Sequence, residues 1–325
     1  MLENEYLVVE ADENGAELVS IYSKKDSTEY LWQADERYWK RHAPVLFPIV
    51  GSLSGKKLMV NGKEYPMGQH GFARDMAFSM VSSTDDTVWF ALCSDEGTKS
   101  RYPYDFRLEI GYILQANKVT TVWRVTNTGN DLELHYQIGG HPAFNCPLLP
   151  ASVKGEISQS ETSQSEISNA DISRSAISGT AAGGQYKQSD YYLHFDTEAP
   201  IAYRLLDDKG LLVDTKYELV TEKGYYKITD DMFYKDALII EGSKVGEVSL
   251  CLPDKTPYLT VIFDSPLFGL WSPAKKNAPF VCIEPWFGRA DRNTFAGDIS
   301  EREYDQALGT GKSREYSFTI RVDGR

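Results

Sequence analysis

The feature that most constrains the fold is a succession of short segments in which apolar and polar residues alternate. Such segments lie at residues 57–65, 87–92, 106–114 and 118–125, with turn residues between them. Alternation with a period of two, with a turn about every eight to twelve residues, is typical of a β-sandwich or barrel. Long helical periodicity is absent, and the best candidate helix, residues 97–102, is short. We therefore expect an all-β fold.

The same pattern extends to both ends of the chain. An Asn14-Gly15 dipeptide joins two apolar segments near the N-terminus, which predicts a hairpin. Strand signals resume at residues 191–195 and continue to residues 317–322. We see no linker that would divide the chain, and a large all-β domain can have this length. We therefore expect one domain over residues 1–325.

Residues 151–187 differ from the rest of the chain. They are rich in Ser, Gln, Glu and Ala, and a five-residue repeat begins at Ile157. This composition is typical of a solvated insertion that has expanded by duplication. The alternative is a short β-solenoid with Ile at the inward positions, although solenoids need stacked neighbours to bury a core.

The charge of the chain argues against some partners. Lysine and arginine number 34 and the acidic residues 47, which gives a net charge of −13. An acidic surface repels phosphate backbones, so we expect no nucleic-acid partner. The N-terminus is acidic, so we expect no signal peptide. The sequence contains no stretch of about 18 apolar residues, so we expect no membrane span.

The four cysteines, at positions 93, 146, 251 and 282, show no spacing typical of metal ligands. They are expected to be buried thiols in a reducing compartment. Together with the absence of a signal peptide, this predicts a cytoplasmic protein without a metal site.

Two rigid segments offer a possible acid/base pair. In Gly-Gly-His-Pro-Ala-Phe-Asn, residues 139–145, glycines and a proline fix the backbone around His141. In Cys-Ile-Glu-Pro-Trp-Phe-Gly, residues 282–288, Glu284 ends a predicted apolar strand at residues 280–283. Histidine titrates near neutral pH, and burial raises the pKa of a carboxyl group toward the range useful to a base. The alternative for Glu284 is a structural carboxylate bound by backbone N–H groups.

The neighbourhood of these segments contains further candidates. Trp286 offers a flat apolar face on which the C–H groups of a sugar pack well. His135 lies inside a predicted strand at residues 132–138 and is expected to be structural, as are His42 and His194.

Two earlier segments offer binding groups. Arg41 precedes a segment too rich in proline for a central strand, and its guanidinium could hold a hydroxyl pair, a carboxylate or a phosphate. The alternative is a surface ion pair. In Gln-His-Gly-Phe-Ala-Arg, residues 69–74, His70 and Arg74 could both face a polar ligand, and Gly71 would let the backbone approach it closely. The alternative for His70 is a loop histidine bound by backbone groups.

Asp236 precedes another apolar strand, at residues 237–240. Its carboxylate could bind a hydroxyl group, or it could serve in a turn.

Four of these segments occur in the order found in the aldose 1-epimerase (galactose mutarotase-like) superfamily, and the sequence resembles its LacX-type branch most closely. The segments lie at residues 41–48, 69–74, 139–144 and 283–286. The resemblance covers nearly the whole chain apart from residues 151–187. It implies a β-supersandwich of large antiparallel sheets with few short helices and a sugar groove on one face.

The resemblance also implies roles for individual residues. Glu284 matches the general base that takes the proton from the anomeric hydroxyl O1, and His141 matches the general acid that protonates the ring oxygen O5. The sugar ring opens and closes again as the opposite anomer, with no cofactor or metal. His70 and Arg41 match substrate-binding positions. Arg74 matches the position that helps to bind phosphate in relatives acting on sugar phosphates.

We therefore expect an isomerase that interconverts the α and β anomers of an aldose or aldose phosphate, as a monomer or homodimer without a cofactor. Asp236 and Trp286 complete the expected substrate site. Two other functions remain open. A carbohydrate sensor would keep the groove but would not need an acid/base pair. Glycoside hydrolysis commonly uses two carboxylates, and only Glu284 stands out as a candidate.

Overall fold

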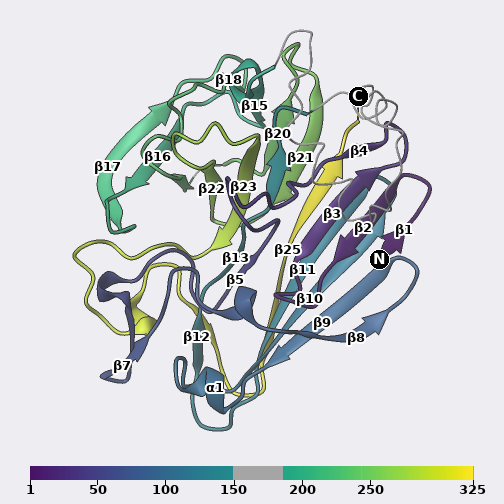
Figure 1. Cartoon of the computed structure of the whole chain (residues 1–325). Helices are drawn as coiled ribbons and strands as arrows, with labels where there is room; N and C mark the ends of the chain where they lie inside the picture. Colours follow the sequence, from purple (N-terminus) through teal and green to yellow (C-terminus); the bar gives the residue numbers. More distant parts are fainter. Residues whose placement is uncertain (149–185, 243, 325) are drawn as a thin grey trace.

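The computed structural model describes residues 1–148, 186–242 and 244–324. The insertion expected at residues 151–187 therefore lies almost entirely outside the described residues. Figure 1 shows a nearly all-β architecture. Its one described α-helix is α1 (Glu96–Lys99), and its short 3-10 turns are Ser54–Lys56, Ala73–Asp75, Gln188–Asp190 and Ile299–Glu301. No helix within the described ranges has the length and apolar character of a membrane span. The expected all-β fold with large antiparallel sheets is confirmed.

The larger of the two main sheets has nine described strands, each antiparallel to its neighbours. In spatial order they are β18 (Tyr225–Lys227), β15 (Tyr192–Phe195), β20 (Glu247–Cys251), β21 (Pro257–Phe263), β25 (Ser313–Val322), β11 (Lys118–Asn127), β10 (Phe106–Gln115), β9 (Thr87–Cys93) and β8 (Ser79–Ser83). In β11, every second residue from Val119 to Asn127 is buried. This is the alternation that predicted these strands.

The second main sheet contains eight described strands, again all antiparallel. Their order is β17 (Leu212–Leu219), β16 (Ile201–Leu206), β19 (Leu238–Glu241), β22 (Leu267–Trp271), β23 (Phe280–Phe287), β13 (Ile138–Gly140) and β5 (Val45–Leu46), while β14 (Ala143–Asn145) also pairs with β23. The proline-rich segment contributes only β5, a two-residue strand at the edge. It therefore forms no central strand, as expected.

Residues from the two main sheets meet in one hydrophobic core. β23 contributes Val281 and Ile283 to this core, and β25 contributes Phe318 and Ile320. Because successive side chains of a strand point to opposite faces, Glu284 and its neighbours two residues away point away from that core. The outer face of the eight-stranded sheet therefore carries the predicted base.

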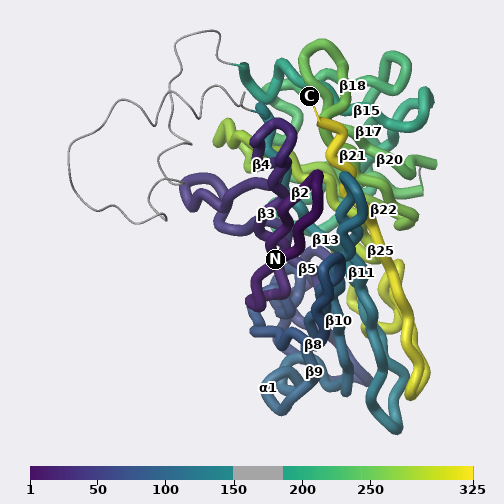
Figure 2. Tube along the Cα trace, turned by 90° about the vertical axis from the view of Figure 1, so that its right-hand side faces the viewer, coloured from purple at the N-terminus to yellow at the C-terminus, as the bar shows by residue number. Residues whose placement is uncertain are grey.

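Three smaller sheets complete the described structure. A four-stranded sheet contains β1 (Leu2–Glu3), β2 (Leu7–Ala11), β3 (Leu18–Ser23) and β4 (Thr28–Glu29), and two pairs are formed by β12 (Leu134–Tyr136) with β24 (Gln306–Leu308) and β6 (Lys57–Val60) with β7 (Lys63–Pro66). The N-terminal strands lie alongside β10 and β11 in Figures 1 and 2. There the hydroxyl of Tyr112 donates to the carbonyl of Ala16 at 2.6 Å. The antiparallel pairing of β2 with β3 confirms the predicted N-terminal hairpin.

Three predicted strands have different bounds in the structure. Residues 57–65 form a hairpin rather than one strand, because Asn61 and Gly62 turn the chain with φ values of 50° and 75°. Residues 132–138 divide between β12, which pairs with β24, and β13, which belongs to the second main sheet. The strand predicted at residues 280–283 continues to Phe287, so Glu284 lies in the middle of β23 and not at its end.

Candidate active site

One continuous register of the second main sheet brings the predicted acid and base together. β13 and β14 both pair with β23, and the opposed pairs Gly139–Trp286 and Ala143–Cys282 belong to the same register. Continued through the residues between these pairs, the register places His141 opposite Glu284. Opposed residues of antiparallel strands have Cβ atoms about 4.5–5.5 Å apart and share a face of the sheet. Sheet pairing therefore brings together two residues that are far apart in the sequence.

The two side chains lie in contact and are buried. His141 Nε2 is 3.3 Å from Glu284 Oε2. Glu284 is 1% exposed and His141 is 8% exposed. Among the described residues, neither carboxylate oxygen has a hydrogen-bond partner, and neither does His141 Nδ1. The structural alternative, a carboxylate bound by backbone N–H groups, therefore does not describe Glu284.

Burial disfavours charge on both members of the pair. It raises the pKa of the Glu284 carboxyl group well above its usual value, and the charge of Asp236 adds to the shift. Burial, followed by the charge of Arg74, lowers the pKa of His141 to about 3. Both shifts favour a protonated Glu284 beside a neutral His141. This neutral pair holds as many protons as the ion pair, and the two states differ by the transfer of one proton between the side chains.

His70 lies beside this pair, with its ring centroid 5.8 Å from that of His141. The backbone N–H of Gly51 donates to His70 Nδ1 at 3.1 Å. A neutral imidazole that accepts at Nδ1 carries its proton on Nε2, so His70 retains one N–H donor. Burial lowers the pKa of His70 well below 6.5, and the charges of His141 and Arg74 follow in importance. The backbone contact is the one expected for a loop histidine, but it occupies only one ring nitrogen.

The fold requires a glycine at position 71. Its φ is 73°, and a Cβ at this position would lie 2.2 Å from the carbonyl oxygen of Phe47. In the structure, the close approach that the glycine permits is to the backbone just after β5. This contact holds His70 against the segment that contains β5.

Arg41 and Arg74 lie side by side near the imidazoles. Arg41 Nη2 donates to Asp75 at 2.6 Å, and its Nη1 donates to the carbonyl of Arg74 at 3.4 Å. Arg74 Nη2 donates to the carbonyl of Gln69 at 2.9 Å, whereas its buried Nε has no hydrogen-bond partner in the described part of the chain. Burial and the charge of Arg41 lower the pKa of Arg74 to about 10. Arg41 thus forms the ion pair that was expected as the alternative to ligand binding. Arg74 Nε lies 4.0 Å from Asp75 Oδ2 but donates no hydrogen bond to the described residues.

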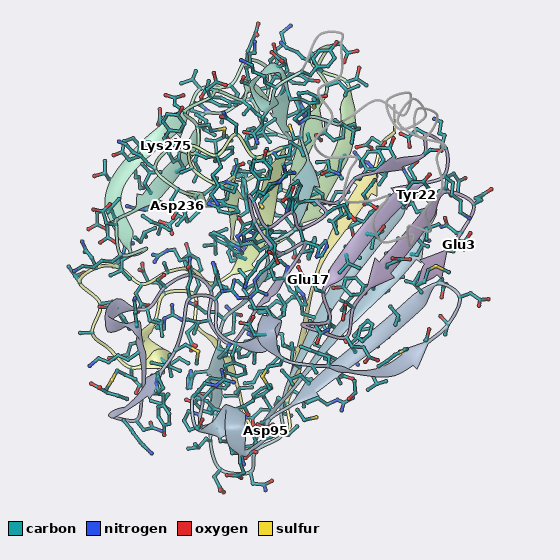
Figure 3. The ribbon with its side chains drawn as sticks, viewed as in Figure 1. Glu3, Glu17, Tyr22, Asp95, Asp236 and Lys275 are labelled. Carbon is teal, nitrogen blue, oxygen red and sulfur yellow. The ribbon has the colours of Figure 1, made fainter. Side chains whose placement is uncertain are left out.

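Glu17, which the sequence did not single out, anchors the Arg41 segment. Its carboxylate accepts from the backbone N–H groups of His42 and Ala43 at 2.6 and 2.8 Å. The next residue, Pro44, accepts at its carbonyl from the backbone N–H of His141 at 3.0 Å. Glu17 lies near the centre of the view in Figure 3. It thus connects the four-stranded sheet to the candidate site.

Two tryptophans flank His141, and sequence reasoning missed both. The ring centroids of Trp39 and Trp271 lie 4.7 and 5.3 Å from that of the imidazole, and both residues are half-buried. Trp271 Nε1 donates to Asp236 at 2.8 Å, which connects Asp236 to the site. The backbone N–H of Asp236 also donates to Phe233 in a turn, as its alternative predicted. Figure 3 shows Asp236 on the side of the molecule that carries β16 and β17.

Trp286 follows Glu284 by two residues and is 4% exposed. A Cβ at Gly269 or Gly139 would lie 2.5 or 2.7 Å from its ring, so the indole occupies space that only glycine leaves on β22 and β13. Its buried Nε1 forms no hydrogen bond with the described residues. Gly139 of the His141 segment therefore provides close contact, and neither it nor Gly140 has a positive φ.

Comparisons with known proteins agree with this architecture. Residues 1–298 match the family described as aldose 1-epimerase. The chain is 32% identical to the plasmid-encoded protein LacX of Lactococcus lactis subsp. lactis over 295 residues, which are 88% of this chain and 87% of that protein. The chromosomal LacX of the same organism is 31% identical over the same shares.

Solved structures give the same result. A galactose mutarotase related enzyme from Lactobacillus acidophilus superposes with a TM-score of 0.83 at 31% identity, over 99% of this chain and 96% of that chain. A galactose mutarotase-like protein from Lactobacillus casei gives a TM-score of 0.82 at 25% identity, over 99% and 98%. The resemblance to the LacX-type branch and the galactose mutarotase-like fold are confirmed, and the chain belongs to the aldose 1-epimerase family.

Proposed function

We propose that this chain interconverts the α and β anomers of an aldose or aldose phosphate, with Glu284 and His141 as its acid/base pair. The supporting observation is the pair itself, with 3.3 Å between nitrogen and oxygen and a carboxylate that is buried without a described hydrogen-bond partner. A buried polar atom left unsatisfied costs about 1–3 kcal/mol. The O1 hydroxyl of a bound sugar would donate to the carboxylate, and the ring oxygen would accept from the imidazole.

Ring opening moves two protons in this proposal. Starting from the ion pair, the Glu284 carboxylate takes the proton of O1 as the C1–O1 bond becomes a carbonyl. The C1–O5 bond breaks with its electrons on O5, and the His141 imidazolium protonates O5. Rotation about C1–C2 exposes the other face of the aldehyde. The reverse transfers, from Glu284 to O1 and from O5 to His141, then close the opposite anomer.

The neutral pair, which burial favours, is the state that follows ring opening. A sugar hydroxyl that donates to Glu284 would stabilise its ionised form, because hydrogen bonds to a carboxylate lower its pKa. We therefore propose that sugar binding shifts the pair toward the ion pair from which the reaction starts. The position of one proton would thus couple substrate binding to catalysis.

The remaining predicted residues bind the substrate in this proposal. His70 Nε2 and the unused donor of Arg74 would bind sugar oxygens or a phosphate, with Arg41 beside them. Asp236 would accept a hydrogen bond from a hydroxyl. The half-buried rings of Trp39 and Trp271 offer faces for sugar C–H groups. That Trp286 also offers such a face stays a prediction.

Anomer exchange tests this function directly. Polarimetry or NMR would follow freshly dissolved glucose, galactose and their 6-phosphates above the spontaneous rate. Since general acid–base catalysis typically contributes about 100- to 10,000-fold, Glu284→Gln and His141→Asn should each lose acceleration on that order. Glu10→Gln, at an exposed position, and His194→Asn make the same chemical changes outside the site and should retain it.

The outcomes separate the remaining functions. Acceleration that both site variants lose supports the mutarotase, and the preferred sugar shows whether the arginines bind a phosphate. Unchanged turnover in Glu284→Gln would exclude Glu284 as the base. A sugar that binds with no acceleration would favour the carbohydrate sensor.

A further inference from the structure

A cysteine lies within reach of the acid/base pair and has no role in the proposed reaction. Cys282 precedes Glu284 by two residues on β23, so both side chains point to the outer face of the sheet. The Cys282 sulfur, a ring nitrogen of His141 and a carboxylate oxygen of Glu284 all lie within 4.8 Å of one another, and all three residues are buried. Together they offer sulfur, nitrogen and oxygen ligands.

We propose that His141, Cys282 and Glu284 bind a thiophilic divalent cation, with Zn²⁺ as the best match. The cation would take the position of the reacting sugar oxygens and block the site reversibly. It would be an inhibitory ligand and would take no part in anomer exchange. The proposal rests on the position of the three side chains and does not depend on turnover.

The separations of the ligand atoms suit a tetrahedral ion. With Zn–N and Zn–O distances near 2.1 Å, two ligands of a tetrahedral site are about 3.4 Å apart. His141 Nε2 and Glu284 Oε2 are 3.3 Å apart. The sulfur lies no more than 4.8 Å from either of its partners, where the ideal separation is about 3.6 Å. A movement of the sulfur by little more than about 1 Å would therefore bring all three ligand atoms to coordination distance. The fourth position of the tetrahedron would remain for water.

The charges also balance. A thiolate, a carboxylate and a neutral imidazole neutralise a divalent cation, so the complex adds no net charge to a buried site. Both oxygens of Glu284 lack a described hydrogen-bond partner and are therefore free to coordinate. Binding would release the protons of Cys282 and Glu284, so affinity should rise with pH. Among the residues that the structure describes, the charged or titratable groups that act on the site are His70, Arg41 and Arg74 beside His141 and Asp236 beside Glu284.

Cobalt(II) reports this geometry by spectroscopy, because a thiolate ligand gives a charge-transfer band in the near ultraviolet and a tetrahedral site gives intense visible bands. The full-length protein, without sugar, would be titrated with Co²⁺ and then with Zn²⁺. We expect both sets of bands, their loss on adding Zn²⁺, and release of about two protons per ion by calorimetry in buffers of different ionisation enthalpy. A sugar that binds at the site should displace the ion.

Variants locate the ion. Cys282→Ser and Cys282→Ala should abolish the charge-transfer band, and Glu284→Gln should weaken binding. Cys93 is exposed, so the expectation of four buried thiols is wrong for this residue, and Cys93→Ser should change nothing. Thermal unfolding shows which Cys282 variant is folded, and the folded one is used.

Three results would overturn the proposal. They are the absence of a thiolate band in the wild type, a band that survives in the folded Cys282 variant, and a band that Cys93→Ser removes. The readout involves no turnover, so a protein that accelerates anomer exchange but binds no cobalt would refute the metal site alone. A protein that binds cobalt without accelerating exchange would refute the proposed function alone.

Discussion

Replacing Glu284 with glutamine should stabilise the fold, by an amount that grows with pH. Burial raises the pKa of this carboxyl group well above 4.5, so the folded protein keeps a proton that the unfolded chain loses. The contribution of the group to stability is therefore complete below pH 4.5 and declines as pH rises toward the folded pKa. Glutamine has a similar shape and no such titration. The variant should thus gain at most about 1.4 kcal/mol per pH unit, or about 2.7 kcal/mol between pH 4.5 and 6.5.

Urea unfolding at fixed ionic strength, at several pH values in this window, would measure the difference. Glu241→Gln is the matched control, because Glu241 accepts from Arg204 at 2.7 Å and from Arg289 at 2.9 Å. Burial raises the pKa of Glu241, but the two guanidinium groups outweigh it and lower the pKa below its usual value. The same substitution should therefore destabilise the fold at this position.

A Glu284→Gln protein no more stable than the wild type, at every pH in the window, would refute this reasoning. It would mean that Glu284 is ionised in the folded protein and that His141 carries its counter-charge. The pair would then rest in the state from which the reaction starts, and sugar binding would not need to shift a proton.

Two further predictions concern the surroundings of the pair. Gly269→Ala should displace the Trp286 ring, lower the free energy of unfolding in urea by about 1–3 kcal/mol and slow anomer exchange. Gly68→Ala, which has open space around it, should have none of these effects. Equal activity of the two variants would contradict the packing role of Gly269. Trp271→Phe keeps a ring but removes the donor to Asp236, so we expect KM to rise up to about tenfold with kcat little changed. A fall in kcat alone would place Trp271 in the chemical step instead.

The fold was predictable wherever one face of a strand is buried and the other is partly exposed. β11 shows this alternation over ten residues and β10 over most of its length, and their predicted bounds differ from the observed ones by two residues or fewer. β23 is buried on both faces and contains a proline. The apolar run that predicted it therefore ends at Ile283, although the strand continues to Phe287. Pairing with β13 and β22 on either side, which no local pattern reveals, holds residues 284–287 in the sheet.

For the site, the sequence predicted residues but not their contacts. His141 and Glu284 were singled out because rigid neighbours frame them, and the structure brings them into contact. Their shared register depends on pairing across the sheet, which no local signal encodes. Trp271 was missed for the same reason, since only its position opposite Cys282 brings it near His141. Trp39 could have been found, because it lies two residues before Arg41.

The shared register of β13 and β14 with β23 also has a consequence for how such a chain can vary in evolution. The pairs that align His141 with Glu284 lie within residues 139–143 and 282–286. The loops in the long stretch between these segments can therefore gain or lose residues without separating acid from base. A single residue added inside either segment, by contrast, would turn the following side chains to the other face of the sheet. Length variation among descendants should thus concentrate between the two segments and spare the segments themselves.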